Sequence, residues 1–185
     1  MLDRIAVLVL ACCVWAGAVQ AQEVGSASGK GTIERIVEPM TGKSEQVTFQ
    51  PRYSYAYPES TGAAKFTWII LTEKEPPLKA WAVAKDRAEA RRLWCETEKT
   101  SFVAVKLDAD WKVDLYFLCP ANGAVNTEML STWNGLDSVV VDFEVRDGKK
   151  LKGTLRTGSG ACGDGETWTY CTPTGDYTFD APLSK

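Results

Sequence analysis

Short runs of alternating apolar and polar residues, separated by turn signals, recur along most of this 185-residue sequence. In residues 138–145 the apolar side chains share one face of an extended strand, and Asp142 and Glu144 share the other. Asp147-Gly148 follows, and Asp-Gly between two alternating runs is a strong signal for a β-hairpin. Turn signals spaced 8–12 residues apart are typical of an antiparallel β protein.

The same reasoning predicts where the strands lie. We expect them at residues 32–37, 46–57, 66–72, 101–107, 112–119, 138–145, 151–157 and 176–181. Pro51 interrupts the second run, and because proline cannot donate to a strand ladder, that strand should be bulged or at an edge. Residues 66–72 are almost continuously apolar, as in a strand buried on both faces. Residues 58–64 are expected to form a loop.

One stretch has a helical pattern instead. Asp86 and Glu89 have the spacing of a capping box, so a helix is expected at about residues 86–96, with a start as early as Lys79 left open. Strands and helices do not alternate, which disfavours a parallel sheet. The sequence therefore predicts a mainly β protein: an antiparallel β-sandwich or partly closed barrel with one short α-helix.

The first 21 residues are typical of a cleaved signal peptide. Arg4 precedes an apolar stretch, and Val19 and Ala21 are small residues at positions −3 and −1 of a cleavage site. The apolar stretch is shorter than the roughly 20 residues that a membrane span needs. A lipoprotein modified at Cys12 is the alternative. We expect a periplasmic or secreted protein with no stable membrane span after removal of the leader.

The mature chain is expected to contain one domain. Residues 22–31 are small, polar and rich in glycine, which predicts a mobile N-terminal tail. Residues 32–185 would then form a single disulfide-stabilised, β-rich domain.

Four cysteines follow the leader: Cys95, Cys119, Cys162 and Cys171. An even number in an exported domain predicts two disulfides. We favour Cys95–Cys119 and Cys162–Cys171, because each pair closes a local loop. A zinc site built from all four cysteines is the alternative, but their spacing matches no common zinc module.

The composition excludes several kinds of chemistry. The sequence has no histidine, which rules out Ser-His-Asp and Cys-His catalysis and every histidine-ligated metal. The formal charge is −3 and there is no basic cluster, which argues against nucleic acid as a partner. No cofactor, metal or catalytic residue is predicted.

Carboxylates are the remaining candidates for acid–base chemistry. Asp142 with Glu144, or Asp164 with Glu166, could form the pair that glycoside hydrolysis requires. Neither pair belongs to a recognisable motif, and alternating charges on a strand are ordinary for a solvated sheet face.

Three aspartates suggest calcium. Asp108 and Asp110 match the first positions of an EF-hand loop, with Asp114 nearby. Lys112 and Val113 then occupy positions that need an oxygen ligand and a glycine. An ordinary Asp-rich turn explains the same residues.

The aromatic residues are the strongest sign of a binding function. Trp68 and Trp94 lie in apolar patterns and should belong to the core. Trp111 falls in an expected hairpin loop, where its ring could be exposed and could contact a partner. The candidate binding residues are Tyr53, Tyr55, Tyr57, Trp111, Trp133 and Trp168.

The sequence therefore favours an exported binding or interaction module. Its partner would be an unknown protein or glycan in the envelope or outside the cell, and an inhibitor or immunity-type protein belongs to this class. The alternative is a carboxylate-dependent hydrolase of glycans or cell-wall material, and a purely structural envelope protein is a third interpretation.

Overall fold

The computed structural model describes residues 23–38, 43–119, 128–131, 139–158 and 174–184. Ten antiparallel strands form one sheet in the order β7-β6-β5-β4-β3-β1-β10-β9-β8, and β2 pairs with β1 outside this path. The strands are β1 (Gly25–Glu38), β2 (Lys43–Phe49), β3 (Tyr53–Thr61), β4 (Ala64–Thr72), β5 (Phe102–Leu107), β6 (Val113–Cys119), β7 (Glu128–Ser131), β8 (Val139–Arg146), β9 (Lys150–Thr157) and β10 (Thr174–Pro182).

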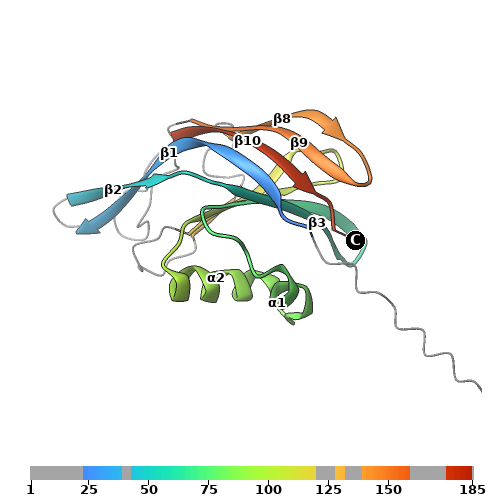
Figure 1. The fold of residues 1–185 in the computed structure, drawn as a ribbon, viewed down its shortest axis with the longest axis horizontal. Helices are drawn as coiled ribbons and strands as arrows, with labels where there is room; N and C mark the ends of the chain where they lie inside the picture. The colour runs from blue at the N-terminus through green and yellow to red at the C-terminus, as the bar shows by residue number, and fades with distance from the viewer. Residues whose placement is uncertain (1–22, 39–42, 120–127, 132–138, 159–173, 185) are drawn as a thin grey trace, which may run out of the picture.

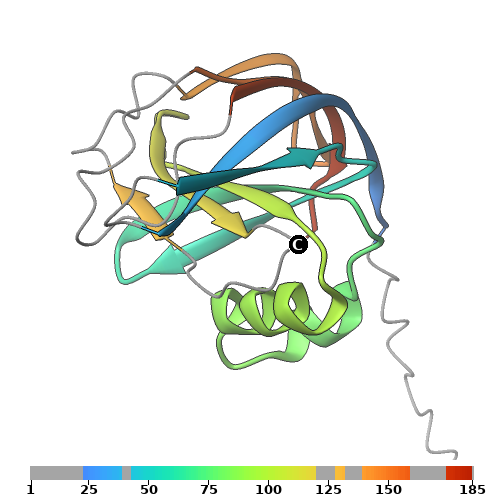
Figure 2. The ribbon, with the colours of Figure 1, turned by 90° about the vertical axis from the view of Figure 1, so that its left-hand side faces the viewer.

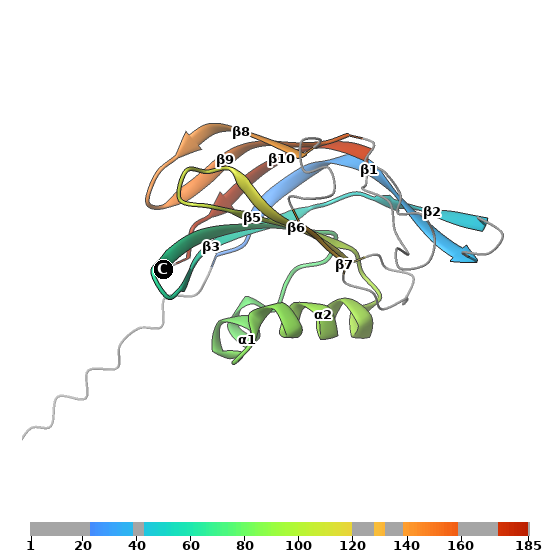
Figure 3. The ribbon, with the colours of Figure 1, turned by 180° about the vertical axis from the view of Figure 1, so that it is seen from behind.

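The sheet curls into a half-barrel, so that β8, β9 and β10 lie over β3, β4 and β5 (Figure 1). Helices α1 (Leu78–Val83) and α2 (Arg87–Glu98) lie below the lower part of the sheet, on the side away from β8–β10 (Figures 2 and 3). The predicted class is confirmed: the protein is mainly antiparallel β and forms a partly closed barrel.

The predicted helix corresponds to α2. Asp86 is its N-cap, and the carboxylate accepts hydrogen bonds from the backbone N–H groups of Ala88 and Glu89 at 2.9 and 3.0 Å. The short helix α1 was not expected as a separate element. It ends at Val83, and Ala84 has extended backbone angles.

The sheet separates two clusters of buried side chains. One cluster fills the inside of the half-barrel, and the other lies between the sheet and the helices. Along β4, Ile69 and Leu71 belong to the inner cluster, whereas Trp68 and Ile70 belong to the cluster under the helices. The prediction that this strand is buried on both faces is confirmed.

The predicted N-terminal tail is wrong from Gly25 onward. Residues 25–31 belong to β1, which pairs with β10 from Ser26 to Thr32. A Cβ atom at Gly25 would lie 1.8 Å from the Asp180 carbonyl oxygen, and one at Gly31 would lie 1.8 Å from the Tyr177 hydroxyl. These glycines allow β1 to approach its neighbours closely, so here the glycine-rich composition reflects packing rather than mobility.

The expected strand over 46–57 is two strands, with Pro51 between them. The expected loop at 58–64 is largely wrong, because β3 continues through Pro58 to Thr61. Since β1 pairs with β3 only at Tyr53 and Ser54, Pro58 lies where β3 has no second neighbouring strand among the described residues. A proline is tolerated at such an edge.

Both expected hairpins are present. Lys112 and Asp108 close the β5–β6 turn, in which the Asp108 N–H donates to the Lys112 carbonyl at 2.9 Å. In the β8–β9 turn, the Asp147 carboxylate accepts from the backbone N–H groups of Lys149 and Lys150. These bonds lower the pKa of Asp147. The short strand β7 was not predicted.

Candidate functional site

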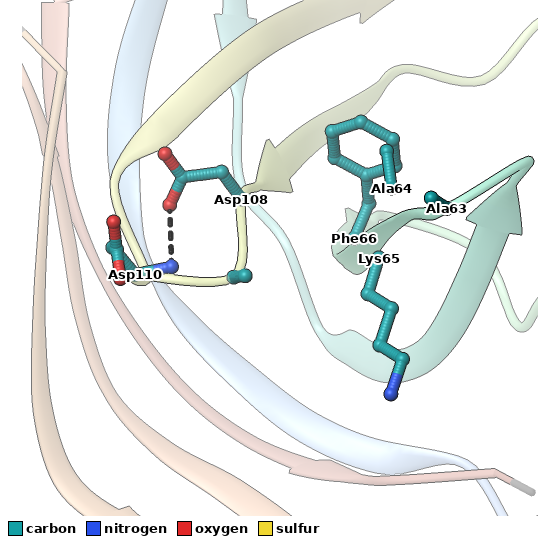
Figure 4. A pocket seen from close by; sticks show the side chains of 7 residues that line it. Ala63, Ala64, Lys65, Phe66, Asp108 and Asp110 are labelled. Atoms are coloured by element: carbon teal, nitrogen blue, oxygen red, sulfur yellow. Dashed lines mark hydrogen bonds between the residues drawn. The ribbon is translucent and has the colours of Figure 1, made fainter.

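A shallow cleft of about 310 Å³ lies between the tip of the β3–β4 hairpin and the tip of the β5–β6 hairpin (Figure 4). An adjoining cavity of about 210 Å³ extends it to Thr67 and Trp111. The residues that line the main cleft are Ala63, Ala64, Lys65, Phe66, Asp108, Ala109 and Asp110.

Local hydrogen bonds shape the β5–β6 side of the cleft. The Asp108 carboxylate accepts from the backbone N–H group of Asp110 at 2.9 Å (Figure 4). It also accepts from the backbone N–H group of Lys112, at 2.9 Å. Asp114 instead pairs with Lys106, with 3.4 Å between Oδ2 and Nζ. The turn and this ion pair account for Asp108 and Asp114, and no group of potential metal ligands occurs in the described part of the chain. The calcium hypothesis therefore gains no support.

Trp111 lies in this loop but is not freely exposed. It is half-buried, and its ring packs edge-on against Phe143 with 5.3 Å between centroids. The Arg146 guanidinium lies 4.9 Å from the Trp111 ring centroid. The backbone of Trp111 has a φ of 66°, which is in the left-handed region. This conformation costs a residue other than glycine about 1–3 kcal/mol, and residues that adopt it are frequent at functional sites. The expectation of a free ring is wrong, although Trp111 still lines the site.

The β3–β4 side of the cleft contributes a second aromatic ring. Phe66 is half-buried and lines both cavities. The Lys106 ammonium lies 3.7 Å from the centroid of this ring, a cation–π contact, while it also pairs with Asp114. Phe66 was not singled out from the sequence, because it forms part of an apolar run that reads only as a buried strand.

The row of strand tyrosines does not form a binding face. Tyr55 and Tyr57 are 4% and 1% exposed, and Tyr53 is half-buried. The rings of Tyr55 and Tyr57 stack with 5.7 Å between centroids, and Trp81 of α1 packs on Tyr55 at 5.6 Å. Alternation correctly placed these tyrosines on one face, but the helices cover that face. The interpretation of Tyr55 and Tyr57 as contact residues is therefore wrong.

Arg91 is the most unexpected residue in this cluster. Arginine is rarely fully buried, yet the Arg91 side chain on α2 is only 2% exposed and donates a hydrogen bond to the Tyr57 hydroxyl. Burial raises the pKa values of Tyr55 and Tyr57, and the Arg91 charge opposes the rise. Arg91 precedes the buried Cys95 by four residues, a spacing that places both on one helix face and that could have indicated its burial.

The Asp142–Glu144 pair lies on the exposed outer face of β8. The two side chains are 59% and 60% exposed, and each forms an ion pair of 2.5 Å, with Arg156 and Lys152 respectively. The hydrogen bond to Glu144 raises the pKa of Lys152. These residues line neither part of the cleft, and they have the arrangement of a solvated sheet face.

The remaining candidates lie outside the residues described. They are Trp133, Trp168, Asp164, Glu166, Cys162 and Cys171. Cys95 is 2% exposed and is disulfide-bonded. In the β5–β6 register, Cys119 lies opposite Phe102, whose ring belongs to the same cluster under the helices as Cys95.

No family model matches this chain, and the searches found no similar curated protein and no similar solved structure. None of the helices in the described ranges is long and apolar enough to cross a membrane. The interpretation of the site therefore depends on its own chemistry.

Proposed function

We propose that this protein is an exported binding protein that recognises another protein through the cleft between the two hairpin tips. The observation that carries the proposal is the pairing of two half-buried rings, Phe66 and Trp111, at one end of the barrel. Both rings line the adjoining cavity, together with the small Ala109 and the charged Lys65 and Asp108. Phe66 also lines the main cleft, whose small residues are Ala63, Ala64 and Ala109. Aromatic anchors beside small pockets are the usual centres of protein interfaces.

The size of the cleft favours a protein partner. Sites for small molecules enclose about 300–1,000 Å³ and bury most of the ligand. The present cleft is at the lower limit and is shallow, so it would accept one protruding side chain more readily than it would enclose a whole ligand. A stoichiometric complex with another exported protein would support the more specific role of an inhibitor or immunity-type protein.

Within the described residues, the competing hydrolase has no comparable observation in its favour. Asp142 and Glu144 line neither cavity and form ion pairs with basic neighbours on β9. An acid catalyst is expected to lie in a cleft, and neither residue lines one.

The decisive experiment compares two substitutions of exposed residues. The tagged, oxidised chain from residue 22 captures partners from envelope and secreted fractions, and the partner is identified, purified and titrated against each variant. Ala109→Arg should fill the cleft and weaken binding at least tenfold, which corresponds to about 1.4 kcal/mol. Val140→Arg on β8 should leave binding unchanged, because Val140 lines neither cavity.

Three results would contradict the proposal. Equal affinities for Ala109→Arg and the unmodified protein would exclude the cleft. A loss with Val140→Arg alone would move the interface to the β8 side. Retention of glycan without a protein partner would favour glycan binding or hydrolysis, and Asp164 and Glu166 would become the first residues to substitute.

Export and disulfide pairing form part of the proposal. We expect the protein isolated from its source to begin at Gln22, whereas an N-terminal lipid-modified Cys12 would indicate a lipoprotein. We also propose the pairs Cys95–Cys119 and Cys162–Cys171. The first is supported by the position of Cys119 opposite Phe102 in the register. In the Cys162→Ser variant, Cys171 should react with a thiol reagent while Cys95 and Cys119 stay protected.

A further inference from the structure

We propose that Arg91 is a positioning residue for the cleft: it acts through Trp68 and Lys106 to hold the Phe66 ring in place. The functional consequence rests on the proposed binding role of the cleft. The positioning itself concerns only the unliganded protein and can be tested without a ligand.

Arg91 connects helix α2 to the sheet. The Arg91 guanidinium lies 4.9 Å from the Trp68 ring centroid and 5.7 Å from that of Tyr57, whose hydroxyl accepts its hydrogen bond. Cation–π contacts are strongest where the cation is desolvated, and Arg91 is almost completely buried. Arg87 adds a second guanidinium, 4.7 Å from the Tyr57 ring. The helix therefore restrains Trp68 from one side.

Lys106 connects Trp68 to Phe66 across neighbouring strands. Tyr57, Trp68 and Lys106 are cross-strand neighbours on β3, β4 and β5. The Lys106 ammonium lies 6.0 Å from the Trp68 centroid and 3.7 Å from that of Phe66. Its side chain is only 17% exposed and pairs with Asp114. Lys106 therefore contacts both the ring held by Arg91 and the ring at the cleft.

Phe66 is the last residue of this network and lies at the cleft. Phe66 lines the cleft, so a row of alternating cations and rings runs from α2 to the cleft: Arg87, Tyr57, Arg91, Trp68, Lys106 and Phe66. Side chains in a packed interior have few alternative arrangements. A change at Arg91 should therefore displace Trp68 and Lys106 and alter the cleft wall.

The test measures Lys106 by NMR in the full oxidised chain. Because the Lys106 Nζ lies over the Phe66 ring, the ring current should shift the adjacent ε-methylene protons upfield. We expect Arg91→Met to move these signals toward the position of a free lysine, and Arg91→Lys to restore part of the shift. The control is Leu78→Ala, which removes a buried side chain from the same cluster but removes no member of the cation–π row.

Unchanged Lys106 signals in a folded Arg91→Met variant would overturn the inference, as would an equal displacement in Leu78→Ala. If Arg91→Met does not fold, Arg91→Gln, which also removes the charge, decides the question, and Lys106 signals identical to those of the unmodified protein would refute the positioning role. The readout needs no ligand. If Ala109→Arg did not weaken binding, the binding role of the cleft would be rejected, but the NMR result on Lys106 would still stand. Unchanged Lys106 signals would likewise reject the positioning role of Arg91 and leave the binding result unaffected.

Discussion

The two outer faces of the half-barrel are built from the same sheet but from different chemistry. The outer face of β3–β5 is covered by α1 and α2, and it carries aromatic rings and the buried Arg91. The outer face of β8–β10 has no helix over it within the described ranges (Figure 1). It carries exposed cross-strand ion pairs. The alternating sequence pattern of the strands is similar on both faces. Whether the outward side chains belong to the core or to the surface depends on whether a helix covers them.

The largest effect should come from the covered face. Trp81→Ala removes a ring that is 3% exposed and that packs on Tyr55 and Trp94. Removal of a buried aromatic side chain costs about 3–5 kcal/mol, measured as the free energy of unfolding in denaturant. The matched control is Val83→Ala, two residues away and 85% exposed, which should change stability by less than about 0.5 kcal/mol. Similar values for both would show that α1 does not seal this face.

The second-largest effect on stability should distinguish Tyr57 from Tyr55, with which it stacks. Tyr57→Phe removes the acceptor of the Arg91 hydrogen bond and should cost about 1–3 kcal/mol, because a charged donor is left buried without it. Among the described residues, the buried Tyr55 hydroxyl has no hydrogen-bond partner of good geometry, although the Arg91 charge lies near it. Tyr55→Phe should therefore be neutral or stabilising. The two melting curves provide the comparison, and a larger loss for Tyr55→Phe would contradict the assigned contacts.

Alkaline pH should weaken the protein through the same buried rings. Burial raises the pKa values of Tyr55, Tyr57 and Tyr177 above that of a tyrosine in the unfolded chain. Their contribution is therefore fully present below about pH 10 and is lost as the pH rises through the folded-state values. Urea unfolding between pH 8 and 11 should show this fall. Tyr55→Phe should make it shallower, and an identical slope in that variant would argue against the burial of this hydroxyl.

The smallest effect should come from the bare face. Asp142→Asn removes the ion pair with Arg156, in which both side chains are more than half exposed. Such pairs are worth less than about 1 kcal/mol and are screened by salt. Thermal unfolding at 0.5 M NaCl should therefore hardly distinguish the variant from the unmodified protein. A large loss that persists in salt would mean that this face is covered by something else.

Much of the fold could be predicted because the relevant signals are local. The Asp147-Gly148 turn and the Asp108–Lys112 hairpin depend on a few adjacent residues, and both are present. The double burial of β4 follows from its continuous apolar run. The Asp86 cap likewise marks the start of α2.

The errors concern contacts between distant parts of the chain. Residues 25–31 look flexible in isolation, but β10 lies 150 residues away and requires small residues opposite it. Tyr57 and Arg91 each look like surface residues, and only their contact shows that both are buried. The candidate cleft is formed by two hairpin tips, so no single stretch of sequence could reveal it.

We propose that the cleft, rather than either outer face, binds the partner. Hydrogen exchange of the backbone amides, measured with and without the purified partner, tests it most directly. We expect added protection at residues 63–67 and 108–111, with little change along β8 and β9. Protection centred on β8 and β9, and none at the hairpin tips, would contradict it.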